Sequence, residues 1–389
     1  MHKLRPLTRR SLMVAGCAAS LVSAGPAFAR AGAGDPRLVV VILRGAMDGL
    51  AALPKLDDPH IEAHRAGLID RAAQPLDGGF ALHSAFTNLA ALYRSGEAAF
   101  IPAVAGPYRE RSHFAAQDLL ECGRADRVVA DGWLNRALQR APAGVSALSI
   151  GPVQPLILRG GGASITSWSP PVLPEASEDT IGRLLELYDS DPILAPSLTA
   201  ALSAEGVLAN GSGAMAPARG RGGDEYRQLL SAAGKFLAEP NGPRIAVVSL
   251  DGWDTHAGQS AMLNQRFGAL DRGIAGLAET LGPAWKQTAV IAVSEFGRTV
   301  RENGARGTDH GTAGLAILAG GAIRGGRVAG EWPGLAPSAL YENRDLAGAN
   351  DVRSLFKGLL RNHLGWDAID LDNFVFPSSA AAPAEATLV

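Results

Sequence analysis

The first long apolar stretch of the chain reads Leu38-Val39-Val40-Val41-Ile42-Leu43 and is rich in β-branched side chains. A continuous apolar run of this length is typical of a strand that is buried on both faces of a parallel sheet. Three similar runs follow, at Ala98 to Val104, Ile245 to Leu250 and Ala289 to Val293. We therefore expect a central sheet of several buried strands.

Segments with the apolar spacing of helices separate these runs. They lie at Ala85 to Arg94, Phe114 to Glu121, Gly223 to Leu237 and Ala261 to Leu281. Strands that alternate with amphipathic helices indicate an α/β architecture in which helices cover a mainly parallel sheet. The fold class predicted from the sequence is therefore α/β.

The middle of the chain departs from this alternation. Residues 146–168 look like short strands joined by three consecutive glycines, and helices are expected at 178–188 and 193–208. Residues 210–223 contain hardly any large apolar side chain, which indicates an exposed loop. Two domains divided at this loop are one alternative. We favour a single sheet-based domain at 30–376 that carries an insertion at about 150–240.

The charge balance excludes one class of partner. The 389 residues contain 36 Lys and Arg against 38 Asp and Glu, so the formal net charge is −2. A protein that binds nucleic acid or an anionic membrane through a basic surface needs an excess of positive charge. We therefore expect no nucleic-acid partner.

The first 29 residues have the pattern of a secretory signal peptide. Four basic residues precede an apolar stretch from Leu12 to about Val22, and a small-x-small cleavage site ends at Ala29. The apolar stretch is too short to span a bilayer, so no stable membrane anchor is expected. Cleavage would remove four positive charges and no negative ones, which takes the formal charge from −2 to −6.

The segment Thr8-Arg9-Arg10-Ser11-Leu12 resembles the twin-arginine export signal, and the Ala- and Gly-rich stretch behind it fits that route. An ordinary signal with two adjacent arginines is the alternative. The twin-arginine export machinery carries folded proteins, often with a cofactor already bound, which favours a metal or another prosthetic group. We expect a periplasmic or secreted protein, with Cys122 as its single cysteine, no intramolecular disulfide and a disordered tail at 377–389.

Polar residues follow the apolar runs at the positions where an open α/β sheet binds its ligands, beyond the carboxyl ends of the strands. Carboxylates and imidazoles that meet at one sheet edge can share metal ions. Each of these motifs, taken alone, can also be purely structural: an Asp-Gly pair can form a turn, and a histidine can cap a loop. The candidate metal ligands are Asp48 after the first run, Asp251, Asp254 and His256 after the third, Glu295 after the fourth, and Asp309 and His310 in a later glycine-rich loop.

Ser112 is a candidate nucleophile, because it precedes the helix predicted at Phe114 to Glu121. A serine at this position most often caps the helix. The free N–H groups at a helix N-terminus also favour an anion, and Arg111 is adjacent. A capping serine that binds a metal ion would become nucleophilic, so the two roles are compatible.

At these residues the chain resembles a bacterial family of exported proteins called domain of unknown function 1501, which is related to the alkaline phosphatase and sulfatase superfamily. The resemblance covers nearly all of the chain after the signal and implies an alkaline-phosphatase-like three-layer sandwich. The matching motifs are Leu43-Arg44-Gly45 with Asp48-Gly49, Leu82-His83, Arg111-Ser112-His113-Phe114 with Ala116-Gln117, Asp254-Thr255-His256, Ser294-Glu295-Phe296-Gly297-Arg298 and Thr308-Asp309-His310-Gly311.

The resemblance implies two sets of metal ligands. Asp48 and Glu295 would hold one cation together with Ser112, and Asp251 or Asp254 would hold the other together with His256 and His310. In an alternative register, Asp309 and His310 form the Asp-His pair of the superfamily. Two cations about 4 Å apart stabilise both oxygens of an in-line displacement at phosphorus or sulfur. Ser112 would attack the ester, while Arg111 or Arg44 would neutralise the developing charge.

The chain departs from the superfamily at Phe296, which stands where an imidazole ligand is expected. Two functions are therefore weighed. One is an exported hydrolase of phosphate or sulfate esters that uses one or two divalent metal ions (zinc, magnesium, manganese or calcium) on a small-molecule or glycan ester. The other is a non-catalytic exported binding or assembly protein with the same fold. Convergence of Asp48, Glu295 and Ser112 would favour the enzyme, and a single-metal site would favour the binding protein.

Overall fold

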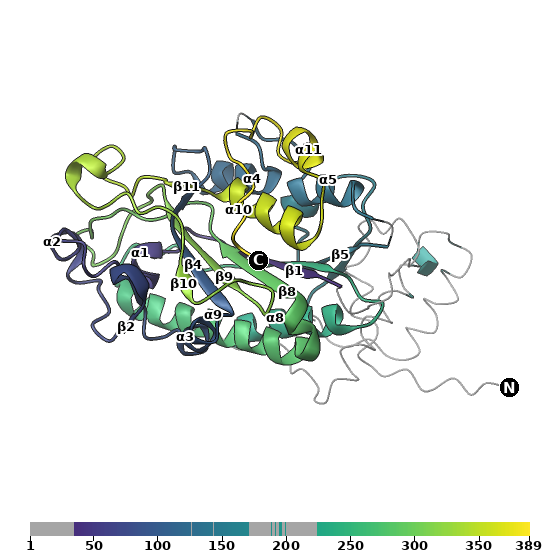
Figure 1. Cartoon of the computed structure of the whole chain (residues 1–389), viewed down its shortest axis with the longest axis horizontal. Coiled ribbons are helices and arrows are strands. Elements are labelled where there is room, and N and C mark those ends of the chain that lie inside the picture. Colours follow the sequence, from purple (N-terminus) through teal and green to yellow (C-terminus); the bar gives the residue numbers. More distant parts are fainter. Residues whose placement is uncertain are drawn as a thin grey trace.

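The computed structural model describes residues 35–125, 127–142, 144–170, 188, 191, 194–196, 199 and 224–389. The predicted signal peptide at 1–29 lies outside these residues, as do most of 178–188, most of 193–208 and all of 210–223. The described part is built around one large sheet whose strands follow the order β10-β4-β9-β8-β1-β7-β5-β6, with β11 beside β4 (Figure 1).

The sheet is mainly parallel. Parallel pairs join β1 to β7 and β8, β5 to β6 and β7, and β4 to β10 and β11, whereas β9 runs antiparallel to both β4 and β8. Its strands are β1 (Arg37–Leu43), β4 (Ala98–Ala105), β5 (Ala147–Ile150), β6 (Ile165–Trp168), β7 (Ile245–Leu250), β8 (Thr288–Val293), β9 (Gly314–Ala319), β10 (Arg327–Val328) and β11 (Asn350–Asp351). A small antiparallel pair, β2 (Gln74–Pro75) and β3 (Ala81–Leu82), lies apart.

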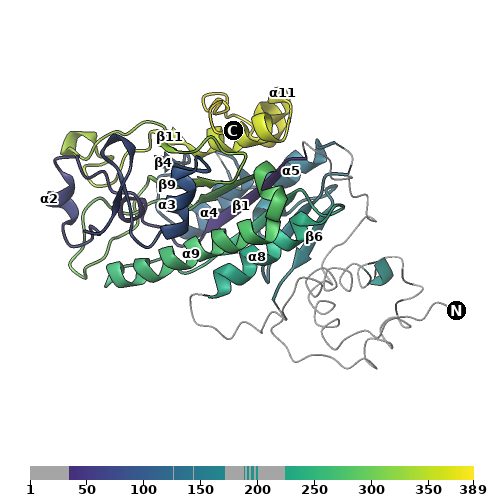
Figure 2. The same cartoon turned by 60° about the horizontal axis from the view of Figure 1, so that its bottom comes forward.

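Helices cover both faces of the sheet, as Figure 1 shows, and Figure 2 shows α8 and α9 side by side over one face. The helices are α1 (Gly49–Ala52), α2 (Ile61–Arg65), α3 (Thr87–Arg94), α4 (His113–Cys122), α5 (Trp133–Gln139), α8 (Asp224–Ala238), α9 (Gln259–Leu281), α10 (Val352–Gly358) and α11 (Ala368–Asp370). The predicted α/β fold with a mainly parallel sheet between two helical layers is confirmed.

The central strand β1 explains why the first apolar run decides the fold. All seven of its residues are buried, and alternate side chains enter opposite cores, since neighbouring side chains of a strand point to opposite faces. Val39 and Val41 pack in the core that α3, α8 and α9 cover. Val40 and Ile42 pack in the core that α5 and α10 cover. The strand therefore needs apolar residues from Leu38 to Leu43, whereas Arg37 at its start is buried with hydrogen-bond acceptors.

Two parts of the predicted insertion at about 150–240 belong to the main architecture. Strand β6 extends the sheet beyond β5, and α8 packs against α9 in the helical layer. The sheet is therefore wider than the apolar runs alone predict. Strand β6 has only Trp168 buried, which is why its sequence lacks the continuous apolar pattern of β1.

The C-terminal tail at 377–389, predicted to be disordered, packs against α10 in the structure. The buried ammonium group of Lys357 donates to the carbonyl oxygens of Ser379 (2.9 Å) and Ala382 (2.8 Å). The backbone N–H of Glu385 donates to the carbonyl of Ser354, and Leu388 is buried. A buried ammonium group requires acceptors, and the tail supplies them. Composition alone does not reveal such long-range contacts.

The loops after β1 and β7 lie close together at the carboxyl edge of the sheet. Gly45 adopts a φ of 115°, and a Cβ atom there would lie only 2.5 Å from the backbone nitrogen of Asp254. Only glycine permits both the backbone conformation and this approach. Within the described ranges, no helix has the length and apolar character needed to cross a membrane.

Candidate metal centre

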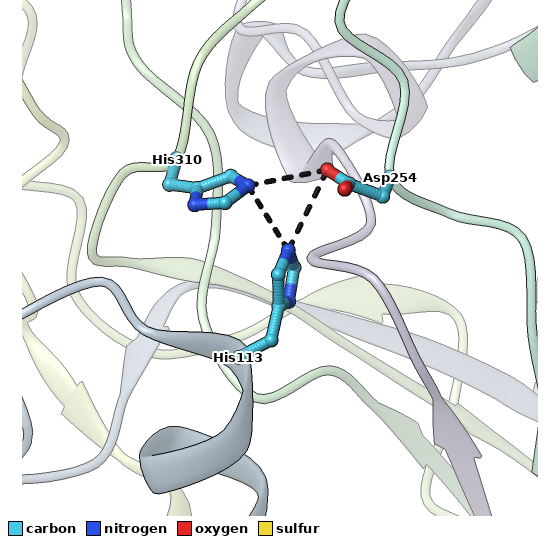
Figure 3. A group of neighbouring side chains, drawn as sticks. All are labelled: His113, Asp254 and His310. Carbon is cyan, nitrogen blue, oxygen red and sulfur yellow. Dashed lines mark hydrogen bonds and ion pairs between the residues drawn. The ribbon is translucent and has the colours of Figure 1, made fainter.

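Three side chains from separate loops meet at the carboxyl edge of the sheet, as Figure 3 shows. His113 begins α4, Asp254 follows β7, and His310 lies in the loop before β9. The Nε2 atoms of His113 and His310 are 3.0 Å apart, and the Oδ1 atom of Asp254 lies 3.5 Å from the first and 3.2 Å from the second.

A third imidazole, that of His256, completes the group. Its Nε2 atom lies 2.8 Å from Oδ1 of Asp254 and 3.1 Å from Nε2 of His310. His256 therefore adjoins Asp254 and His310, whereas the ligand atoms that all lie within 4.8 Å of one another are those of His113, Asp254 and His310. We call His113, Asp254, His256 and His310 the strand-edge cluster.

Glu295 orients the ring of His113 through its Nδ1 atom, on the side opposite Nε2. Its Oε1 atom is 2.6 Å from Nδ1 of His113, and the Glu295 side chain is fully buried. Burial alone would raise the pKa of Glu295, but hydrogen bonds from His113, from Gln117 and from the backbone of Gly45 lower it. The hydrogen bond to this ionised carboxylate raises the pKa of His113. Glu295 is therefore a partner of a candidate ligand and does not reach the cluster itself.

The orientation of His310 is fixed by backbone groups. Its Nδ1 atom lies 3.1 Å from the carbonyl oxygen of Arg111, and its own carbonyl accepts a hydrogen bond from Arg344. Arg111 has a φ of 61°, in the left-handed region that non-glycine residues rarely adopt. Burial lowers the pKa of His310, and the neighbouring His113 lowers it further. His310 thus keeps a proton on Nδ1 and a lone pair on Nε2.

A carboxylate also lies behind His256. The Oδ1 atom of Asp309 is 3.6 Å from Nδ1 of His256 and accepts a hydrogen bond from Asn303. Only His113 therefore has a carboxylate hydrogen-bonded to the ring nitrogen that faces away from the cluster, and Asp309 lies near His256 without a hydrogen bond. The arrangement at His113 is typical of histidines that bind metal ions, because the partner fixes the tautomer and the ring orientation.

Arg298 holds the carboxylate of the cluster. Its fully buried guanidinium donates to Oδ1 of Asp254 at 2.7 Å. It also donates to the carbonyl oxygens of Gly45, Ala46 and Trp253, so it joins the loops after β1 and β7. Burial opposes ionisation of Asp254, but the attraction of Arg298 outweighs it and lowers the pKa of the carboxyl group.

The Nε2 atoms of His113 and His310 are too close to be stable unless a positive charge lies between them. A neutral imidazole that donates from Nδ1 presents only a lone pair at Nε2, so two such atoms at 3.0 Å cannot hydrogen-bond to each other. A proton on His113 or a bound cation resolves this contact. Two imidazoles and one carboxylate, with the imidazole of His256 beside them, are a donor set that suits a divalent transition metal such as zinc. The residues of the strand-edge cluster therefore fit a single metal ion.

Asp48 lies apart from the cluster. It is 1% exposed, pairs with Arg65 at 2.5 Å and accepts hydrogen bonds from Gln259 and from the first turn of α1. Its oxygens are therefore occupied by protein donors. Together with the position of Glu295 behind His113, this means that the expected first metal set of Asp48, Glu295 and Ser112 is not formed.

Arg111 and Arg44, the two arginines predicted to neutralise the developing charge, form ion pairs outside the strand-edge cluster. Arg111 forms ion pairs with Glu342 and with the buried Asp345, at 2.5 Å and 2.7 Å. Arg44 pairs with Glu121 at 2.6 Å and donates to Gln117. Neither guanidinium contacts the strand-edge cluster, because each is held by carboxylates of neighbouring segments.

The side chains of Ser112 and Asp251 make no recorded contact with the strand-edge cluster in the part of the chain that the structure describes. Asp251 is exposed, and its backbone carbonyl accepts a hydrogen bond from the hydroxyl of Tyr226. Ser112 occupies the N-cap position of α4, but its side chain makes no capping hydrogen bond and is exposed. The commonest structural role of an N-cap serine is therefore not fulfilled here, although its neighbour in sequence, His113, is a candidate ligand.

Sequence reasoning overlooked His113 and Arg298 as functional residues. Both lie in motifs that carry the family resemblance, but neither is a carboxylate or imidazole directly after a predicted strand. A usable signal for His113 is its position beside Ser112. Phe296, which cannot coordinate, stacks on His113 with a centroid distance of 4.9 Å and lies 5.3 Å from His310. It supports two imidazoles where a ligand was expected.

The sequence matches one family model, described as Protein of unknown function (DUF1501), over residues 103–368. The chain belongs to this family. The match covers His113, Asp254, His256 and His310, and no curated protein matches the sequence.

Solved structures resemble the chain at low identity. Ps i-CgsB in complex with k-i-k-neocarrahexaose is 9% identical, with a TM-score of 0.42, over 90% of this chain and 77% of that one. An alkaline phosphatase superfamily protein from Vibrio parahaemolyticus is 10% identical, with a TM-score of 0.38, over 83% and 71%. The phosphonate monoester hydrolase of Agrobacterium radiobacter is 12% identical, with a TM-score of 0.41, over 84% and 73%.

Proposed function

We propose that this chain is a hydrolase of phosphate or sulfate esters that depends on one divalent metal ion, in a site that differs from the Asp48, Glu295 and Ser112 set expected of the enzyme. The observation that carries the proposal is the convergence of the Nε2 atoms of His113 and His310 with Oδ1 of Asp254, with His256 beside the last two. The cluster lies at the carboxyl edge of the sheet, where α/β proteins bind their ligands. A metal ion bound there would polarise the ester and stabilise negative charge on its oxygens.

Residues that contact the cluster orient its imidazoles and keep its carboxylate ionised. Glu295 and the carbonyl oxygen of Arg111 accept from the Nδ1 atoms of His113 and His310, so the Nε2 atoms face one another and Asp254. Arg298 keeps Asp254 ionised. Metal binding requires the neutral ring of His113, so a bound cation takes the place of the Nε2 proton that Glu295 favours by raising the pKa of His113.

Ser112 is the proposed nucleophile. Its hydroxyl lies at the N-terminus of the ten-residue helix α4, makes no capping hydrogen bond and is one residue away from His113. In the proposed reaction its oxygen forms a bond to phosphorus or sulfur while the bond to the ester oxygen breaks. The serine proton passes to solvent, and the departing alcohol takes up a proton. Water then cleaves the enzyme ester and restores Ser112.

Replacing Ser112 with alanine is expected to lower kcat by at least about a thousand-fold, as the loss of a covalent nucleophile typically does. Metal content should be unchanged, because Ser112 is not in the strand-edge cluster. Hydrolysis of aryl phosphates and aryl sulfates by the purified protein measures the effect. Ser95→Ala, at an exposed serine after α3, is the matched control. Full activity in the Ser112 variant would show that another group or water attacks the ester.

A non-catalytic metal-binding protein is the second candidate. The observation that favours it is the engagement of Asp48 by Arg65 and of Glu295 by His113, which leaves ligands for one metal ion. Metal analysis, followed by a screen of phosphomonoesters, phosphodiesters and sulfate esters, separates the two candidates. A stoichiometric metal ion with no turnover of any ester class would support the binding protein and contradict the hydrolase.

We also propose that the protein is exported to the periplasm or secreted by the twin-arginine machinery, on the basis of residues 1–29. Replacing both Arg9 and Arg10 with lysine is expected to abolish export, because the paired guanidinium groups define this signal. Cell fractionation followed by detection of the uncleaved precursor measures the outcome. Normal export of the double variant would assign the chain to the general secretory route.

A further inference from the structure

A separate cleft opens beside the start of α9. Its volume is about 310 Å³, at the lower end of the range for small-molecule sites. Its walls come from the segment after α2, from the residue after β3 and from the first two turns of α9. The residues that the argument uses are Leu68, Asp70, His83, Gln259, Leu263 and Asn264.

His83 supplies a hydrogen-bond donor to this cleft. Its side chain is only 9% exposed and packs edge-on against Phe267, with a centroid distance of 4.9 Å. The backbone N–H of Ala85 donates to Nδ1 at 3.2 Å, so a neutral His83 carries its proton on Nε2. No described residue accepts a hydrogen bond from Nε2, although this atom is not sealed from solvent. Nε2 of His83 is therefore free to donate a hydrogen bond to solvent or to a ligand.

Acceptors lie on the same walls. Each oxygen of the Asp70 carboxylate accepts one backbone hydrogen bond, from Ala72 at 2.9 Å and from Ser84 at 2.7 Å, and retains capacity for another. Burial would raise the pKa of Asp70, but these hydrogen bonds lower it. The exposed amide of Asn264, which can both donate and accept, has no hydrogen-bond partner among the described residues.

The charged and polar groups that line the cleft favour a neutral ligand over an anion or a cation. Asp70 repels anions, and the nearby Arg71 is already paired with Glu62 in a bidentate contact. The Nε2–H of His83 presents positive polarity, which disfavours a cation. A neutral ligand that both donates and accepts hydrogen bonds satisfies all these groups, and a hydroxyl group does so. Leu68 and Leu263 add apolar surface for carbon-bound hydrogens.

We propose that this cleft binds a single neutral pyranose ring. Vicinal sugar hydroxyls would accept from Nε2–H of His83 and donate to Asp70, while the amide of Asn264 would bond to a third hydroxyl. The volume suits one ring more than a long oligosaccharide. The cleft is distinct from the strand-edge cluster and uses none of its four side chains.

The cleft and the strand-edge cluster share a wall. Gln259 lines the cleft, and its Oε1 atom accepts a hydrogen bond of 2.6 Å from Thr308, two residues before His310. Gln259 itself begins α9, three residues after His256. A sugar in the cleft therefore lies next to the loops that hold the metal ligands. That the sugar is part of the substrate rests on the proposed function, whereas its binding does not.

The test titrates the metal-free protein with the methyl α- and β-pyranosides of glucose, galactose and mannose, followed by saturation-transfer NMR. At least one pyranoside should bind, and its affinity should fall about ten-fold in His83→Phe and in Asn264→Ala, as expected for the loss of one hydrogen bond each. Phenylalanine keeps the ring that packs on Phe267. Asn264→Ala changes an exposed side chain, so it tests the cleft even if the His83 variant does not fold.

Gln265→Ala is the matched control, because Gln265 is the exposed neighbour of Asn264 and does not line the cleft. It should bind the pyranoside like the unmodified protein. The proposal is overturned if none of the pyranosides binds, or if Asn264→Ala and Gln265→Ala bind equally well. Sugar binding without ester hydrolysis would support the cleft assignment and contradict the hydrolase. Ester hydrolysis without sugar binding would support the hydrolase and contradict the cleft assignment.

Discussion

Replacing His310 with alanine is expected to reduce the affinity for a divalent metal ion by more than about a hundred-fold. Its Nε2 atom lies 3.0 Å from Nε2 of His113, 3.1 Å from Nε2 of His256 and 3.2 Å from Oδ1 of Asp254, so it contacts every other member of the strand-edge cluster. Residues that merely orient metal ligands typically contribute ten- to a hundred-fold to affinity, and a direct ligand should exceed this. Competition with a chromophoric chelator measures the affinity.

His60→Ala is the matched control for this experiment. His60 lies at the start of α2, and its ring stacks on His64, away from the cluster. Its loss should leave metal content and affinity unchanged. Equal metal binding by the His310 and His60 variants would show that the strand-edge cluster is not the metal site. Circular dichroism of both variants separates a lost ligand from a lost fold.

The sheet could be predicted from sequence because its buried strands impose a simple requirement. Residues 38–43 of β1 lie between two helical layers, so they must be apolar, and the same holds for residues 289–293 of β8. The short strands expected within 146–168 are β5 and β6, although β6 lies at the sheet edge and has only Trp168 buried. Continuous apolar runs thus reveal central strands better than edge strands.

The candidate site could be predicted only in part. Loops that follow strands must meet at the carboxyl edge, which explains why Asp254, His256 and His310 come together. The same reasoning also selected Asp48, which instead pairs with Arg65, a residue of α2. That partner comes from tertiary packing and not from strand order. The alternative of an Asp-Gly turn was closer to the structure, in which Asp48 caps the short helix α1 that begins at Gly49.

His113 was overlooked for a similar reason. It lies at the start of α4 and enters the cluster because Glu295 anchors its Nδ1 atom and Phe296 supports its ring. The sequence presented Glu295 as a metal ligand and Phe296 as the loss of one. In the structure both residues hold the imidazole that completes the cluster. A residue beside a ligand therefore needs a tertiary structure before its role can be assigned.

Replacing Arg298 with methionine is expected to lower the free energy of unfolding by about 1 to 3 kcal/mol, the typical cost of leaving buried hydrogen-bond acceptors without a donor. The guanidinium is fully buried and donates to Asp254 and to the carbonyl oxygens of Gly45, Ala46 and Trp253. Methionine fills similar space but leaves these acceptors unpaired. Urea denaturation followed by circular dichroism measures the change.

Arg301→Met is the matched control, because Arg301 is exposed, lies in the segment after Arg298 and donates to Asn343 only. Its stability should change by less than about 0.5 kcal/mol. Arg298→Lys should be intermediate, since an ammonium group restores the charge beside Asp254 but not the fork that joins the two loops. Metal affinity should fall in parallel, because Asp254 loses the partner that orients it. Equal stability of Arg298→Met and Arg301→Met would mean that the loops after β1 and β7 are held together without this guanidinium.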